Sequence, residues 1–250
     1  MTDIQIVEYR DWSQFKAEYL RDLFGDGIFR ASEFVFRGQS DEAWALETSF
    51  DRWFRLRYRE GSTDRLAIAD ALIREFKAEL TRRYPQHDSL AASEAAVIAL
   101  AQHFGVPTRL LDWSGSPYIA AFFAFSDAMA MSMTSKHIGV WALRRSAPVW
   151  NAESGVALVE LAGGGNDRLR QQMGCFTLNR TPYRTLEEYV RTGPEGPPAL
   201  IKAIVPTSEA ITALADLDAM SINHFTTFPE IAGCALAAQL RVLIGGGGRK

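Results

Sequence analysis

The chain is poor in cysteine and histidine, has no long apolar run and carries no large excess of charge of either sign. Its two cysteines, Cys175 and Cys234, fit a reducing compartment and do not define a disulfide framework. The four histidines are scattered without the paired spacing of metal ligands, so we expect no metal cofactor. The longest apolar run, 118–125, is too short to cross a bilayer, and no basic region followed by an apolar run opens the chain. We therefore expect a cytoplasmic protein without a membrane partner.

Several functional classes lack their sequence signatures. The chain has no G-x-S-x-G elbow and no catalytic-cysteine motif, which disfavours the hydrolases that depend on them. The glycines at 163–165 are not followed by lysine and a hydroxyl residue in Walker register, so a flexible loop is the better interpretation. The net charge of −3 gives no general field for nucleic acid, although four arginines occur between 52 and 59 among aromatic residues. A solvated helix face explains that basic segment better than a phosphate or nucleic-acid surface does.

The stretch 102–117 is the densest in reactive side chains. Gly105 and Pro107 end one apolar helix, and a serine followed by Pro117 can start the next. The connection between these two helices carries Thr108, Arg109, Asp112, Trp113, Ser114 and Ser116. Two interpretations remain open: Arg109 and Asp112 pair to tie down a loop, or the connection holds a ligand.

Arg37 is the first candidate for ligand binding. It ends the strand formed by Phe34, Val35 and Phe36, so its guanidinium should lie at a sheet edge and suit a phosphate or carboxylate. Gly38 would let a ligand approach the backbone. The alternative is a salt bridge from Arg37 to an internal carboxylate such as Asp112.

His103 is a weaker candidate. At the end of a predicted helix it can serve as a base, contact a phosphate or pack in the core with a backbone hydrogen bond, and the packed group is the default. Cys175, in a predicted strand, is expected to be inert core rather than a nucleophile.

Several motifs, in order and spacing, resemble those of the FRG domain family over about 34–178. They are Phe36-Arg37-Gly38-Gln39, Trp44-Ala45-Leu46, Arg52, Gln102-His103-Phe104-Gly105 running on to Thr108-Arg109-Leu110-Leu111-Asp112-Trp113-Ser114, Arg168, and Gln172-Met173-Gly174-Cys175-Phe176. Thr48-Ser49 stands where the family usually has Pro-Ser, which affects only the local turn. The resemblance implies a bacterial or phage-related setting and a toxin or defence role.

A more distant resemblance in layout is to the diphtheria- and cholera-type ADP-ribosyltransferases. It implies that Arg37 binds the diphosphate of NAD and that hydroxyl and aromatic groups at 112–116 line the nicotinamide end, with an acid on a later strand. That last position falls near Gln172, which is not acidic, and Glu230 is the other candidate. The resemblance thus gives Arg37, Gln172 and Glu230 as catalytic candidates. The proposed cofactor-binding set is Arg37, Gly38, Gln39, His103, Thr108, Arg109, Asp112, Trp113, Ser114 and Ser116. The alternative for Trp113 and Ser114 is that they only cap the following helix and pack against it.

The periodicity predicts an α+β fold with a curved mixed or antiparallel sheet and a helical insertion around 50–105. Strands are expected at 4–9, 34–36, 138–143, 175–178 and 200–205. Helices are expected at 12–24, 64–83, 89–104, 118–129 and 231–240, and a further helix is expected to start at 206–209. We expect a single FRG-type domain over 1–243, with a motif-bearing core at 30–180, a C-terminal α/β part at 181–243 and a flexible tail at 244–250.

Three functions follow from these patterns. The first is an NAD-dependent ADP-ribosyltransferase or NAD glycohydrolase, with a protein or nucleic-acid acceptor. The second is a non-catalytic module that binds a nucleotide or phosphorylated ligand. The third is structural, with Arg37, Arg109, Asp112 and Gln172 forming a buried polar network.

Overall fold

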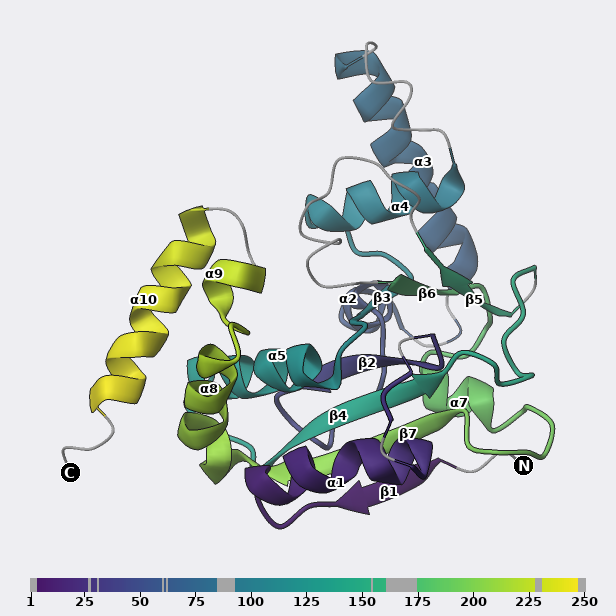
Figure 1. Ribbon diagram of the computed structural model, residues 1–250. Coiled ribbons are helices and arrows are strands. Elements are labelled where there is room, and N and C mark those ends of the chain that lie inside the picture. The colour runs from purple at the N-terminus through teal and green to yellow at the C-terminus, as the bar shows by residue number, and fades with distance from the viewer. Residues whose placement is uncertain are drawn as a thin grey trace.

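The computed structural model describes residues 4–26, 28–30, 32–59, 61, 63–84, 93–153, 155–160, 175–227 and 231–246. The strands are β1 (Gln5–Glu8), β2 (Phe34–Gln39), β3 (Leu110–Trp113), β4 (His137–Arg144), β5 (Val156–Val159), β6 (Cys175–Asn179) and β7 (Leu200–Pro206). The helices are α1 (Trp12–Phe24), α2 (Ser49–Arg55), α3 (Arg65–Arg83), α4 (Glu94–His103), α5 (Pro117–Ala130), α7 (Leu186–Val190), α8 (Ala210–Ala219), α9 (His224–Thr227) and α10 (Ile231–Gly246). Figure 1 shows their arrangement.

Two sheets form the centre of the fold. The four-stranded sheet has the order β1-β7-β4-β2, in which β1 and β7 are parallel and the other pairs antiparallel. The three-stranded sheet has the order β3-β6-β5 and is antiparallel throughout. Phe36 of β2 and Ser114 after β3 join the sheets, because their backbone amides donate to each other's carbonyls at 2.7 and 2.6 Å. The motif around Arg37 therefore lies beside the motif that contains Asp112.

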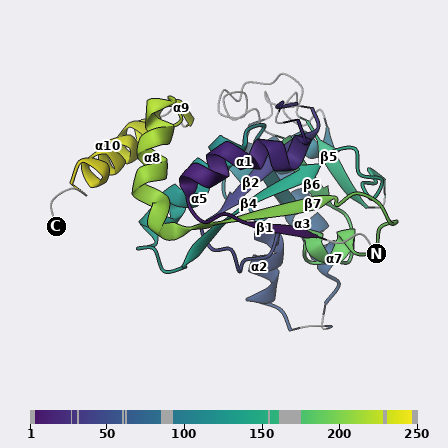
Figure 2. The same ribbon diagram turned by 60° about the horizontal axis from the view of Figure 1, so that its bottom comes forward.

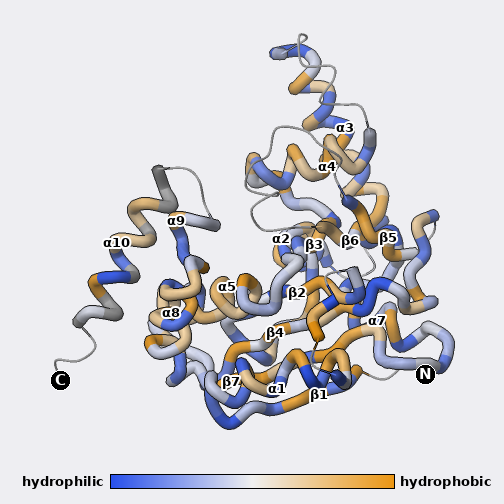
Figure 3. The backbone as a smooth tube through the Cα atoms, viewed as in Figure 1, coloured by the Kyte–Doolittle hydropathy of each residue, from blue (hydrophilic) through white to orange (hydrophobic). Residues whose placement is uncertain are grey.

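Apolar side chains cover both faces of the four-stranded sheet. On one face, Phe34 and Phe36 of β2 pack with aromatic residues of α1 and with the small and aromatic residues of α5. Val35, which the pleat of β2 turns the opposite way, packs with Trp113 and Trp141 on the other face. The orange and white colouring of β4, β7 and α5 in Figure 3 shows this apolar centre, whereas α3 carries many hydrophilic residues.

Helices α2, α3 and α4 form the insertion between β2 and β3, as predicted. In Figure 1, α3 and α4 stand above the three-stranded sheet, and α10 lies at the left of the view. Asp64 caps α3 and Ser93 caps α4, each accepting a hydrogen bond from a backbone amide of the first turn. Figures 1 and 2 both place α9 and α10 beside α8.

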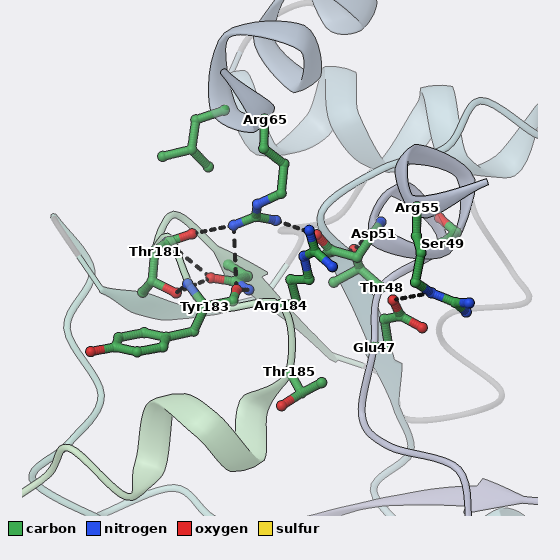
Figure 4. A network of polar contacts seen from close by, with 12 residues as sticks. Glu47, Thr48, Ser49, Asp51, Arg55, Arg65, Thr181, Tyr183, Arg184 and Thr185 are labelled. Carbon is green, nitrogen blue, oxygen red and sulfur yellow. Dashed lines mark hydrogen bonds and ion pairs between the residues drawn. The ribbon is translucent and has the colours of Figure 1, made fainter. Parts of the chain in front are cut away.

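A polar network joins the insertion to the three-stranded sheet (Figure 4). The Nη1 of Arg65, in the first turn of α3, donates to the carboxylate of Asp51 on α2. Its Nη2 donates to the carbonyls of Thr181 at 2.5 Å and Tyr183 at 3.3 Å, just beyond β6. One guanidinium thus holds three segments that are distant in sequence.

The α+β prediction is confirmed, and the strands at β1, β2, β4, β6 and β7 lie where the sequence indicates. Two four-residue strands differ from the prediction: β3 takes the place of the predicted connection at 110–113, and β5 lies within the segment predicted to be rich in loops. Helix α10 continues to Gly246, into the predicted tail, and 247–250 lie outside the described residues. No helix within the described ranges combines the length and apolar character needed to span a membrane.

Candidate functional site

Arg37 lies where the two sheets meet. Within the four-stranded sheet, Arg37 is paired with Trp141 of β4. The bridge between Phe36 and Ser114 brings the end of β3 next to β2. The Nη1 of Arg37 donates to the backbone carbonyl of Asp112 at 2.8 Å, and the Asp112 carboxylate is 3.9 Å away. The predicted salt bridge between the two is therefore present, at the long end of the range for an ion pair.

The protein leaves the guanidinium of Arg37 incompletely bonded. Burial lowers the pKa of Arg37, the charge of Asp112 raises it, and the charge of Arg52 lowers it again. The Nε atom is buried and has no hydrogen-bond partner among the described residues, although the side chain as a whole is 23% exposed. A second carboxylate, that of Asp127 on α5, also interacts electrostatically with Arg37. Burial raises the pKa of Asp127, and the positive charge of Arg37 lowers it. The site is thus a partly buried cation with unused donor capacity.

Asp112 is held from its other side by Gln102. The Gln102 Nε2 donates to both carboxylate oxygens at 2.9 Å, and its Oε1 accepts from the hydroxyl of Thr108. Gln102 and His103 are neighbours in the sequence, but it is Gln102 that bonds to Asp112. His103 is exposed and contacts Phe104 edge-on at a ring distance of 5.0 Å, so the default of a packed core histidine is wrong.

Three of the predicted binding residues serve packing instead. Trp113 is 2% exposed and its Nε1 donates to the Thr177 hydroxyl at 3.0 Å, because alternation along β3 turns Asp112 outward and Trp113 inward. Gln39 is buried and accepts from the indole of Trp141 at 2.7 Å. Gly38 faces the backbone of α5 rather than open space for a ligand.

The two serines form the entry to α5. Ser114 is buried, and its hydroxyl donates to the carbonyl of Ser116 at 2.9 Å and accepts from the Ser116 amide at 3.0 Å. Ser116 is the N-cap residue and Pro117 begins the helix, but the Ser116 side chain makes no capping hydrogen bond. The interpretation of this corner as a helix start is confirmed, and the hydroxyl of Ser114 is engaged within the turn.

Arg109 belongs to a different surface. Its Nη2 pairs with Asp70 of α3 at 2.7 Å, so the predicted pair between Arg109 and Asp112 is wrong. Burial lowers the pKa of Arg109, with the charge of Asp70 opposing this effect. Together with Thr108 it lines a groove of about 190 Å³ between α3 and α4, with Ile73 and Ile98 also in its lining. The predicted binding residues that do not serve packing therefore lie in two places, the site at Arg37 and this groove between α3 and α4.

Two predicted catalytic residues, Gln172 and Glu230, lie outside the described residues. Cys175, the first residue of β6, is buried beside Trp113, and burial raises the pKa of its thiol to about 11. A thiol with so high a pKa carries little thiolate near neutral pH, which confirms the interpretation of Cys175 as inert core. Within the described residues, no group of three or more metal-binding side chains is arranged to hold an ion.

A family model, that of the FRG domain, matches residues 32–132, a range that contains both Arg37 and Asp112. The chain contains an FRG domain. The match begins just before β2 and ends just after α5, so it includes the helical insertion and the junction of the two sheets. No curated protein and no solved structure matches the chain.

Arg37 and Asp112 both lie within the matched range. They are 75 residues apart in sequence, yet the side chain of Arg37 donates a hydrogen bond to the backbone carbonyl of Asp112. The later Gln172 motif lies beyond the matched range, but β6, which follows it, pairs with β3 from within that range. A strand from outside the matched segment therefore pairs with a strand inside it.

Proposed function

We propose that the FRG domain binds an anionic nucleotide, NAD foremost, at Arg37. The observation that carries this proposal is the incomplete bonding of the Arg37 guanidinium: one backbone carbonyl, one carboxylate at 3.9 Å, and a buried Nε without a partner among the described residues. Desolvating a donor without replacing its hydrogen bonds costs free energy, and such groups recur at functional sites. A phosphate is the ligand that a planar guanidinium fork suits best.

The finer proposal is ADP-ribosyl transfer or NAD hydrolysis, in a bacterial toxin or defence context. It is supported by the neighbouring positions of Arg37 and the Ser114–Ser116 entry to α5, which agree with the transferase layout described above. Asp112 and Asp127 provide carboxylates within the field of Arg37, where an acid could stabilise a cationic ribose. NAD is the only cofactor that this proposal requires.

A binding module without catalysis is the second candidate. It is favoured by the burial of Trp113, whose indole is committed to Thr177 in the core and does not offer a face to a nicotinamide ring. In that case Arg37 would recognise the phosphate of a nucleotide and the chemistry would be absent. The two candidates share the ligand and differ only in turnover.

Replacing Arg37 by alanine is expected to weaken binding of NAD and ADP-ribose about 10- to 100-fold, because charge-assisted hydrogen bonds to phosphate are lost. Isothermal titration calorimetry measures this affinity, and Arg37→Lys should recover only part of it, since lysine lacks the fork. Arg82→Ala, on the exposed side of α3, is the matched control. Nicotinamide release by the wild type then separates an enzyme from a binding module. Unchanged affinity in a folded Arg37→Ala protein would contradict the proposal.

We further propose that an acceptor, if transfer occurs, is a nucleic acid that contacts the segment 52–59. Arg52 and Arg55 are exposed there, and the guanidinium of Arg57 lies 4.9 Å from the ring of Trp53, a combination of charge and aromatic surface that suits single strands. Glu47, 3.5 Å from Arg55, offsets only part of this charge. Arg52 also lies within the electrostatic field of Arg37, so the basic segment adjoins the proposed nucleotide site.

The triple variant Arg52→Ala, Arg55→Ala, Arg57→Ala should weaken binding of a single-stranded RNA oligonucleotide and reduce the slope of log K against log salt by about two. Fluorescence anisotropy at several salt concentrations measures both quantities. The control removes three charges elsewhere, by Arg74→Ala, Lys77→Ala and Arg82→Ala. Equal losses in the two triple variants would show that net charge, and not this surface, determines binding.

A further inference from the structure

The carboxylate of Asp112 combines exposure with tight orientation. Its side chain is 62% exposed, yet the amide of Gln102 donates to both of its oxygens at 2.9 Å and the guanidinium of Arg37 stands 3.9 Å away. Polar contacts at so exposed a group contribute little to the stability of a fold. The arrangement is therefore better explained by what the carboxylate can bind than by what it stabilises.

The direction of the Gln102 amide is set by its neighbours. The hydroxyl of Thr108 donates to Oε1, which leaves Nε2 to face Asp112. The Thr108 hydroxyl is itself fixed, because it accepts from the amide of Leu110 at 3.3 Å. The Ser49 hydroxyl accepts from the Thr108 amide at 3.0 Å and donates to its carbonyl at 3.2 Å. A chain of defined donors thus runs from α2 through 108–110 and α4 to the exposed carboxylate.

We propose that Asp112 accepts hydrogen bonds from the ribose hydroxyls of the nucleotide whose phosphate Arg37 binds, with Gln102 and Thr108 as positioning residues. This inference rests on the proposed function and names the part of the ligand that is recognised. An ionised carboxylate only accepts hydrogen bonds, and the two hydroxyls of a ribose are donors at the right separation for its two oxygens. The adjacent guanidinium disfavours a metal ion at this carboxylate and favours an anion beside it.

The geometry also explains why an aspartate, with its short side chain, suits position 112. The backbone carbonyl of Asp112 holds Arg37 at 2.8 Å while its side chain points outward, so one residue places the phosphate donor and the hydroxyl acceptor side by side. A sugar attached to a phosphate at Arg37 then passes over the carboxylate. A ligand without the hydroxyls would cover the carboxylate without satisfying it, which is costly.

The experiment compares the affinities of ADP and 2′,3′-dideoxy-ADP for the full chain by calorimetry. The wild type should bind ADP about tenfold more tightly or better, since hydrogen bonds to a charged group are lost with the hydroxyls. In Asp112→Ala this ratio should fall to about one while the affinity for dideoxy-ADP is retained, and in Gln102→Leu and Thr108→Val it should fall part of the way. Glu79→Ala, which removes an exposed carboxylate of α3 away from Arg37, should keep the wild-type ratio.

The outcomes separate the inference from the proposal on which it rests. A wild type that binds both nucleotides equally, or an Asp112→Ala variant that keeps the preference for ADP, would overturn the inference and leave nucleotide binding at Arg37 intact. A wild type that binds neither nucleotide would overturn the proposed function together with the inference. Urea unfolding of each variant shows that the binding data come from folded protein.

Discussion

Gly38→Ala is expected to destabilise the FRG domain by about 3 kcal/mol or more, at the upper end of the cost of overpacking a core. A methyl group on Gly38 would stand 1.9 Å from the carbonyl oxygen of Ala120 and 2.9 Å from the amide nitrogen of Ala124. Both atoms belong to the backbone of α5, which cannot move aside as a flexible side chain can. Phe122 and Phe125, fully buried on the same helix, hold α5 in place.

Urea unfolding followed by tryptophan fluorescence measures this loss, and the melting temperature should fall by roughly 10 °C for a chain of this size. Gly139→Ala is the matched control in the neighbouring strand: the nearest atom to an added methyl is the flexible Lys202 Cε at 3.3 Å. We expect that variant to stay close to the wild type. If Gly38→Ala unfolds like Gly139→Ala, the close approach of α5 to β2 is not present in solution.

Gly38 shows why the role predicted for a motif residue can be wrong even where the motif itself is present. The prediction was space for a ligand, and the structure places the backbone of α5 there. The sequence predicts that a buried strand ends at Arg37 and that Gly38 follows it, whereas β2 runs on to Gln39 and contains both residues. Helix α5, which begins almost 80 residues later in the sequence, fills the space in front of Gly38. No local sequence pattern around Gly38 indicates this contact. The same holds for Arg109, whose partner Asp70 comes from α3 rather than from the neighbouring Asp112.

The longer elements were predictable because their apolar residues recur with a helix or strand period over many positions. Strand β3 was not, because four residues with one exposed aspartate between buried neighbours resemble a connection. Once β3 exists, its alternation decides which motif residues reach the site: Asp112 outward and Trp113 inward. Gln102 enters the site only through the fold, since the turn at 104–108 brings the end of α4 back over β3.

The network in Figure 4 contains the other position at which a single substitution should have a large effect. The Asp51 side chain is fully buried and that of Arg65 is 10% exposed, so neither charge is well solvated. Burial raises the pKa of Asp51, and the hydroxyl of Thr48 and the charge of Arg65 lower it. A buried ion pair of this kind adds little net stability, but removal of one partner leaves an uncompensated charge.

Arg65→Met is therefore expected to cost about 3–5 kcal/mol near neutral pH, and to separate α3 from the segment at 181–183. Without the guanidinium, the pKa of Asp51 in the folded state rises further above its unfolded value. A carboxyl whose folded pKa is raised contributes stability at low pH and loses it as the pH rises through that pKa. The deficit of the variant should consequently be smaller near pH 5 than near pH 7.5, which urea unfolding at the two pH values measures.

Two comparisons make the result specific to the buried pair. Arg82→Met removes an exposed arginine from the same helix, where the pair with Glu79 is well solvated, and should change stability little at either pH. The double variant Asp51→Leu, Arg65→Met removes both buried charges and should be more stable than Arg65→Met alone, because no unpaired carboxylate remains. A loss in Arg65→Met that is small, or that the second substitution deepens, would mean that the carboxylate of Asp51 reaches water and that the arginine does not hold the insertion to the three-stranded sheet.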